Sequence, residues 1–327
     1  MSMGRERHWR PLPPVLRLMQ SHPEGTEDMA QAPQLDFDGF VARKKSDRST
    51  GGIETTGHEY TYTFDRQSRI AFENTRPLAY AVEASVRLFK QMGKHQLLGN
   101  AVRVSERQFP RIHGITKQAC DTLQIAMPQV FVVNSPVFNA GTLGTNEDSF
   151  MIVHSSLVDQ YTDEELLTVI GHECGHIHNS HVAYLTALHY LTYMAGMFLP
   201  WVLQPALVAL RTWSRRAEIT CDRAGMLVSK DQQAAERAIT KLAVGSRKLY
   251  EEFNLEAFLE QHQEGNEGIG KYMEVFATHP WLPKRVLAMR VFGESQLFQK
   301  ATGAAATGLT MSEVDSRVAA LLKGDAT

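Results

Sequence analysis

The sequence predicts an α+β protein that is mostly helical, with a small antiparallel sheet next to one central helix. Helical spacing of apolar residues indicates that the central helix begins after Thr162, where Thr162 and Glu165 form a capping-box pattern. A further helix is expected at 106–123. Because 43% of the 327 residues are hydrophobic, the chain can fill a sizeable core. Short runs rich in β-branched or apolar residues read as extended segments at 101–105, 128–133, 137–143 and 150–154.

The central helix contains the stretch VIGHECGHIHNSH, residues 169–181. His172 and His176 are four residues apart, so their imidazoles lie on one face of the helix and can meet one metal ion. Glu173 lies beside them, where it can serve a water bound to that metal. The alternative is that both histidines are satisfied core residues around an exposed glutamate.

The spacing of the next histidines limits the type of site. A third histidine at 182 would mark the H-E-x-x-H-x-x-G-x-x-H class, but this position is Val182, which excludes that class. His178 and His181 are turned away from the chelating face by their helical angles. We therefore expect these two histidines to be surface residues or to lie behind the ligands.

A second helical segment, 214–225, offers the missing ligand. Glu218 and Asp222 are four residues apart and share a helix face. Glu218 can therefore complete a zinc site with two histidines and one glutamate. Asp222 can accept a hydrogen bond from a ligand imidazole and fix its tautomer. Taken alone, the segment could also be a solvated charged helix.

Together these motifs resemble a known family. HECGH, followed by Ser214-Arg215 with Glu218 and Asp222, is similar to the gluzincin peptidases related to HtpX and the CAAX prenyl protease type 1, the forty-eighth metallopeptidase family. Asn139-Ala140 before the helix and the segment from His279-Pro280 to Arg285 after it also match. The resemblance covers about residues 98–295.

The resemblance implies a gluzincin-type catalytic domain that binds one Zn²⁺ per chain. It implies metal ligation by His172, His176 and Glu218, proton transfer by Glu173, and support of an imidazole by Asp222. It further implies that Asn139 and Ala140 line the substrate cleft. His279 and Arg285 are expected to stabilise the negative oxygen that develops on the attacked carbonyl. Without the family, Asn139 would be an ordinary turn residue, and 279–285 would be a proline turn with a surface arginine.

Four regions are expected along the chain. Residues 1–34 read as a disordered N-terminal segment. Residues 35–97 read as an N-terminal extension, with a strand or hairpin where Tyr60, Tyr62 and Phe64 alternate with threonines and a helix opened by Pro77. The metallopeptidase domain is expected at 98–300, with amphipathic helices at 231–245 and 282–300. A linker and a short helix, which could dock on the body or on a partner, are expected at 301–327.

The uncharged run 182–210 bears on membrane contact. A single crossing would place His176 and Glu218 on opposite sides of the bilayer, which a shared zinc forbids. Only a hairpin would fit, and each of its arms is about fourteen residues, short of the roughly twenty that span a bilayer. We expect a hydrophobic helical hairpin packed on the protein or dipping into one leaflet, with true insertion left open.

Charge and cysteine content limit the remaining classes. The formal net charge is −2, so the sequence predicts no general attraction to nucleic acid. Three cysteines without a visible export signal favour a reducing compartment and a cytoplasmic location, with membrane-surface contact left open. Cys174 and Cys221 adjoin the two halves of the site and could approach each other, although small buried residues are the simpler interpretation. The sequence leaves the oligomeric state undetermined.

The sequence therefore predicts a zinc metalloendopeptidase that hydrolyses internal bonds of extended or unfolded polypeptides, in part at a membrane surface. The segment 149–156 is expected to be the edge strand that holds an extended peptide by main-chain hydrogen bonds. Cleavage of prenylated peptides is disfavoured, because the chain has no room for a large transmembrane chamber. Two alternatives remain: a zinc-containing latent or chaperone-like binding module without constitutive proteolysis, and a helical membrane-surface adaptor with a chance motif.

Overall fold

The computed structural model describes residues 58–75, 82, 84, 86, 99–145, 148–195, 200–265 and 282–323. These residues belong to one compact unit, 54–327. The expected N-terminal segment 1–34, most of the expected helix after Pro77, and His279 lie outside the described residues.

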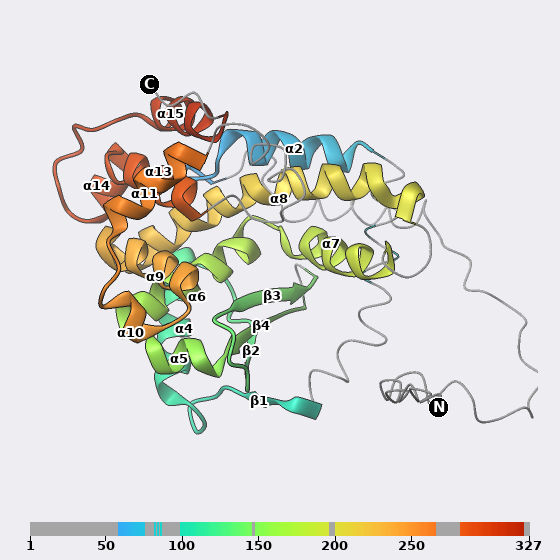
Figure 1. Cartoon of the computed structure of the whole chain (residues 1–327). Coiled ribbons are helices and arrows are strands. Elements are labelled where there is room, and N and C mark those ends of the chain that lie inside the picture. The colour runs from blue at the N-terminus through green and yellow to red at the C-terminus, as the bar shows by residue number, and fades with distance from the viewer. Residues whose placement is uncertain are drawn as a thin grey trace, which may run out of the picture. The chain divides into compact units, whose positions relative to one another are not determined.

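The described sheet has four strands in the order β1-β2-β4-β3 (Figure 1). The strands are β1 (Ala101–Arg103), β2 (Gln129–Val133), β3 (Ala140–Gly144) and β4 (Ser149–His154). The pairs β1–β2 and β3–β4 are antiparallel, but β2 and β4 are parallel. The small sheet is thus as predicted, but it is mixed rather than wholly antiparallel. After β2 the chain runs to the outside as β3 and then turns back, so β4 enters beside β2 in the same direction.

This topology corrects the prediction for the edge strand. The segment 149–156 was expected at the edge, but β4 lies between two strands, and Met151 and Val153 are fully buried in the core. The outer strand on this side is β3, which packs against α6 (Asp163–His178) and α7 (Val182–Ala195). An apolar run with both faces covered is typical of an interior strand.

The central helix α6 begins with the predicted capping box. The backbone N–H of Glu165 donates to Oγ1 of Thr162 at 3.3 Å, and the N–H of Thr162 donates to Oε2 of Glu165 at 3.0 Å. On one side α6 packs on α4 (Pro110–Leu123), which starts four residues later than expected, because Pro110 occupies its first turn. On another side α6 packs along α8 (Pro200–Ser229).

Three glycines allow α6 and α8 to approach closely. A Cβ at Gly175 would lie 2.7 Å from the Cβ of Ala224, and a Cβ at Gly225 would lie 2.7 Å from the carbonyl oxygen of Thr168. A Cβ at Gly171 would meet the side chain of Val228 at 2.8 Å. Because Gly171 and Gly175 each precede a histidine of the motif, this close packing brings both imidazoles next to α8.

Within the run 182–210, α7 and the first part of α8 pack against each other, as expected for the two arms of a hairpin; residues 196–199 between them lie outside the described part of the chain. Leu188, Leu207 and Leu210 are buried in a cluster that also includes Phe72 and Trp213. Among the described residues, no helix is both long and apolar enough to cross a membrane. The structure also joins the hairpin to the segment 214–225, since α8 is one helix of 30 residues.

The strand expected around Tyr60, Tyr62 and Phe64 is wrong. The chain makes a turn there and enters α2 (Thr63–Glu73), which packs on α8. Asp315 accepts hydrogen bonds from the backbone N–H of Thr63 at 3.0 Å and from its hydroxyl at 2.6 Å. This distant carboxylate caps the start of α2, and such a tertiary contact overrides the local β propensity of the tyrosines and threonines.

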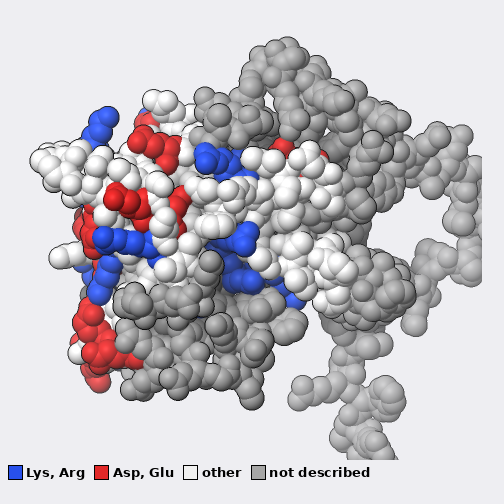
Figure 2. All heavy atoms as spheres, turned by 90° about the horizontal axis from the view of Figure 1, so that it is seen from above, with Lys and Arg blue, Asp and Glu red and all other residues white. Residues whose placement is uncertain are grey.

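The remaining helices are α5 (Ser155–Gln160), α9 (Gln232–Val244), α10 (Arg247–Tyr250), α11 (Leu255–Gly265), α13 (Leu282–Gly293), α14 (Gln296–Ala301) and α15 (Met311–Lys323). The helix expected at 282–300 is two helices, because Ser295 caps a new one. The helix α15 docks on the body, where Val314 and Val318 are fully buried. Acidic and basic side chains both occur on the face that carries α2 and α15 (Figure 2). Arg317 of α15 pairs with Glu294 at 3.1 Å.

Candidate metal centre

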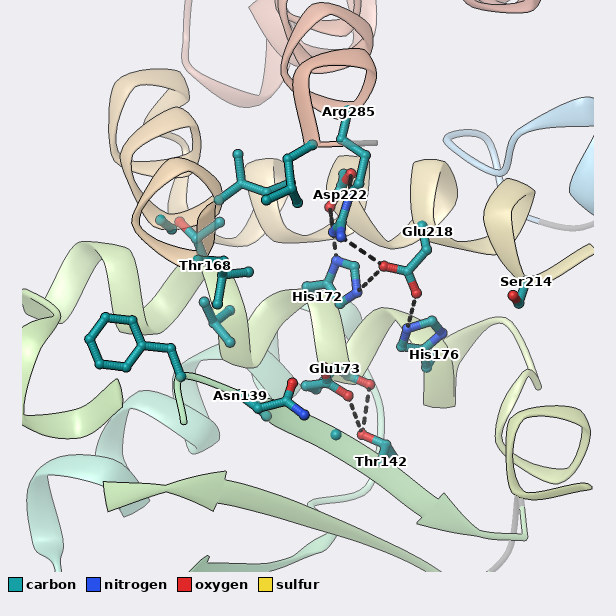
Figure 3. Close-up of a pocket in the computed structure, with 18 of the residues that line it drawn as sticks. Asn139, Thr142, Thr168, His172, Glu173, His176, Ser214, Glu218, Asp222 and Arg285 are labelled. Atoms are coloured by element: carbon teal, nitrogen blue, oxygen red, sulfur yellow. Dashed lines mark hydrogen bonds and ion pairs between the residues drawn. The ribbon is translucent and has the colours of Figure 1, made fainter. Parts of the chain in front are cut away.

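The two histidines of α6 and one glutamate of α8 converge on a common point (Figure 3). Nε2 of His172 lies 3.6 Å from Oε2 of Glu218, and Nε2 of His176 lies 3.6 Å from Oε1 of the same residue. Ligand atoms around a tetrahedral zinc ion, with bonds of about 2.1 Å, are separated by roughly 3.4 Å. The donor types fit such an ion, and each imidazole nitrogen lies close to this separation from one oxygen of Glu218.

Asp222, one turn after Glu218 on α8, contacts the imidazole of His172. Oδ1 of Asp222 lies 3.0 Å from Nδ1 of His172, so the carboxylate can accept the proton of the nitrogen that faces away from Glu218. Burial disfavours the charged form of His172, but the hydrogen bond to Asp222 and the charge of Glu218 outweigh it and raise the pKa of this imidazole.

Arg285, at the start of α13, ties the two carboxylates together. Its Nε and Nη2 donate to Asp222 at 2.8 and 2.6 Å, and its Nη1 lies 3.0 Å from Oε2 of Glu218. Burial disfavours the ionised form of Asp222, but the charge of Arg285 outweighs it and lowers the pKa of Asp222. All three guanidinium nitrogens thus face carboxylates, whereas the family resemblance implied that Arg285 stabilises the oxygen of the attacked carbonyl. This geometry favours a role in holding Glu218 and Asp222.

Glu173 points from α6 towards the outer strand β3 (Figure 3). The hydroxyl of Thr142 on β3 donates to Oε2 of Glu173 at 2.8 Å. Both side chains are buried, so their relative orientation is defined by the packing of β3 on α6. Sequence reasoning missed Thr142, because the spacing of residues within one helix does not indicate which strand residue will face it.

A cavity of about 970 Å³ opens onto these groups. Asn139 and Ala140, expected to line the cleft, both border it, as do His172, Glu173 and Glu218. Much of its wall is apolar. The apolar residues come from α7, α9, α11 and α13, among them Leu185, Leu188, Ile239, Leu242, Phe258 and Met289.

Cys221 offers a competing set of ligands. Single ligand atoms of His172, His176 and Cys221 can lie within 4.8 Å of one another. However, Sγ of Cys221 lies 3.2 Å from Nδ1 of His176, the ring nitrogen opposite to the one that faces Glu218. Glu218 is therefore the stronger candidate for the third ligand, because its two oxygens face the Nε2 atoms of the two imidazoles.

The thiol of Cys174 contacts Cys120 and not Cys221, the neighbour that the sequence suggested for it. Sγ of Cys174 lies 3.8 Å from Sγ of Cys120 on α4, while Cys221 contacts His176. All three are free and buried.

Comparison with known proteins identifies the family. Residues 106–291 match the sequence model described as peptidase family M48. The chain belongs to this family. The matched span contains α6, α8 and most of α13, and thus His172, His176, Glu218, Asp222 and Arg285. No solved structure matches the chain.

Named relatives of this M48 protein are metallopeptidases and proteases. The plastoglobule-localized metallopeptidase 48 of Arabidopsis thaliana is 33% identical over 210 residues, which cover 62% of this chain and 60% of that protein. The protease HtpX homolog 2 of Methanosarcina mazei is 25% identical over 216 residues, covering 56% of this chain and 72% of that protein. The chain therefore spans less than two thirds of the Arabidopsis relative.

Proposed function

We propose that this M48 protein is a zinc-dependent endopeptidase that hydrolyses internal bonds of extended or unfolded polypeptides. The observation that carries the proposal is the convergence of both Nε2 atoms of His172 and His176 on Glu218, each at 3.6 Å. His172, His176 and Glu218 would hold the ion. Zinc bound there supplies a Lewis acid that polarises the carbonyl and makes a water molecule more acidic.

Glu173 acts as the general base and acid. It takes a proton from the attacking water and delivers it to the leaving nitrogen, which requires a carboxylate held between these two positions. The 2.8 Å hydrogen bond from Thr142 to Oε2 sets the orientation of this carboxylate. Asp222 and Arg285 hold His172 and Glu218 in place from behind.

The outer strand β3 supplies a place for an extended peptide. The carbonyl of Asn139 accepts from the backbone of His154, so it points towards β4, whereas the N–H of Gly144 donates to Oγ1 of Thr186 on α7 at 2.9 Å, on the opposite side. Alternation along the strand then directs the N–H and C=O of Ala140 and Thr142 away from β4 and towards the cleft. A substrate that adds there as a strand binds through its main chain, with little demand on sequence.

The apolar wall of the cavity favours substrates with exposed hydrophobic side chains, as unfolded and membrane-associated polypeptides have. The three free cysteines favour a reducing compartment, and we propose a cytoplasmic location with contact to membrane or lipid surfaces.

The test is hydrolysis of unfolded casein by the purified protein, with zinc content measured in parallel. Glu173→Gln should lower turnover by about 10²-fold or more and keep the metal, because the amide cannot accept the proton. Glu164→Gln, an exposed change in the first turn of the same helix, is the matched control and should keep turnover. A chelator should abolish hydrolysis in both active forms. If Glu173→Gln hydrolyses casein as fast as the wild type, the role of Glu173 as general base is wrong. If the wild type binds zinc but does not hydrolyse casein, the enzyme proposal fails in favour of a binding module. A purified protein without stoichiometric zinc would refute the metal site.

A further inference from the structure

The imidazole of His176 contacts a second histidine, His181, through the ring nitrogen that does not face Glu218. Its Nδ1 lies 3.2 Å from Nδ1 of His181. The helical angle of an uninterrupted helix turns His181 away from the chelating face, and of the two positions expected from the sequence, at the surface or behind the ligands, the structure has the second. In the structure α6 ends at His178, and Ser180 adopts a positive φ of 57°. The chain therefore folds back, and the N–H of His181 donates to the carbonyl of His176 at 2.9 Å.

His181 in turn contacts a buried carboxylate. Its Nε2 lies 3.0 Å from Oδ2 of Asp65 on α2, and neither side chain is appreciably exposed to solvent. Asp65 also accepts hydrogen bonds from Nε1 of Trp213 at 2.8 Å and from Oγ1 of Thr220 at 2.7 Å. Burial disfavours its charged form, but His181 and these two donors outweigh it, so the pKa of Asp65 is lowered from 3.8.

The protons along these contacts can be assigned without conflict. Because Nε2 of His176 faces Glu218, a neutral ligand imidazole must carry its proton on Nδ1. That proton can be donated to Nδ1 of His181, which leaves the proton of His181 on Nε2, facing Asp65. Sγ of Cys221 lies 3.2 Å from Nδ1 of His176 and 3.6 Å from Nδ1 of His181, but sulfur is a weak acceptor and competes poorly for the proton.

We propose that His181 and Asp65 are positioning residues for His176, holding its ring orientation and tautomer for the metal. The two histidines of the motif would then each be backed by a carboxylate, His172 directly by Asp222 and His176 through His181 by Asp65. The inference rests on the proposed zinc site. It makes α2, which precedes the matched family span 106–291, a working part of that site.

The experiment measures zinc affinity by competition with a chromophoric chelator and records the visible spectrum of the Co²⁺-substituted protein. His181→Leu and Asp65→Asn should each weaken zinc binding by about 10- to 100-fold and alter the Co²⁺ spectrum, as loss of a group behind a metal ligand does. His181→Asn can still accept a hydrogen bond from His176 and should therefore lose less affinity than His181→Leu. Asp65→Asn keeps one acceptor oxygen, which can still accept from Trp213, and places an amide N–H₂ where Thr220 and His181 face the carboxylate, so thermal stability is measured in parallel.

Asp315→Asn is the matched control. It changes another carboxylate that holds α2, through Thr63, but does not contact either imidazole. It should lower the thermal stability of the metal-free protein and leave zinc affinity and the Co²⁺ spectrum unchanged. If His181→Leu and Asp65→Asn also bind zinc like the wild type, the positioning role is refuted, and the contacts only stabilise the fold. A wild-type protein that binds no zinc would instead refute the proposed function itself.

Discussion

Arg285 binds Asp222 with two parallel hydrogen bonds, from Nε to Oδ2 at 2.8 Å and from Nη2 to Oδ1 at 2.6 Å. The same Oδ1 atom lies 3.0 Å from Nδ1 of His172. The orientation of an imidazole on α6 therefore depends on an arginine more than a hundred residues later in the chain, through a carboxylate on α8.

Arg285→Lys should lower both zinc affinity and turnover. A lysine ammonium is a single point of charge and cannot form the paired contact with Asp222 while also reaching Glu218. We expect about a 10- to 100-fold loss of zinc affinity, measured by chelator competition. Arg290→Lys is the matched control, since Arg290 lies on the same helix and pairs with Glu236 and Glu256 away from the metal centre. Equal zinc affinity in the two variants would argue against a role of Arg285 in holding the carboxylates.

Thr142→Val should lower turnover without changing the metal content. The valine keeps the shape of the side chain but removes the hydroxyl that donates to Glu173 at 2.8 Å. Loss of a hydrogen bond to a charged group costs about 1.5 kcal/mol, so we expect about a tenfold lower kcat in the casein assay. Thr142→Ser, which keeps the hydroxyl, should restore most of the activity. If the serine variant is as slow as the valine variant, the effect comes from packing and the orienting role is wrong.

Gly175→Ala should destabilise the protein and weaken zinc binding together. The added methyl would lie 2.7 Å from the Cβ of Ala224, so α6 and α8 must separate, and with them the imidazoles and Glu218. Overpacking of this kind costs about 1–3 kcal/mol, measurable by urea unfolding. The control is Gly114→Ala within α4, where nothing lies within 4 Å of the added Cβ. That variant should be equally or more stable than the wild type, by up to about 1 kcal/mol, because alanine favours the helix. Unchanged zinc affinity in Gly175→Ala would contradict the close-packing explanation.

His178 should make the metal-free protein less stable as the pH falls from about 6.5 to about 4. Burial, together with the charge of His58, lowers the pKa of His178 from 6.5 to about 4 in the folded state. Between these values the unfolded chain binds more protons than the folded protein, so stability decreases as the pH falls. Urea unfolding at pH 7 and pH 5 measures this change after chelator treatment. His178→Gln should show a smaller loss between the two pH values; an unchanged loss would assign it to other groups.

Local patterns in the sequence were sufficient to predict the helix α6 and the shared face of its two histidines at the candidate metal centre. The capping box at Thr162 and the spacing of His172 and His176 depend only on the geometry of one helix, which repeats every few residues. For the same reason Glu218 and Asp222 could be assigned to one helix face, and the hairpin and the helix near the C-terminus could be predicted.

Only the tertiary structure decided how groups from distant segments contact one another around this candidate centre. The order of the strands, which makes β3 rather than β4 the outer strand, depends on how the chain returns after β2. The partners Thr142, Arg285 and Asp65 come from a strand and two helices whose placement is determined by packing. The fold-back of His181 depends on one residue with positive φ beyond the end of α6. No periodic pattern in the sequence predicts such contacts, because they join residues whose separation in the sequence has no fixed relation to their distance in space.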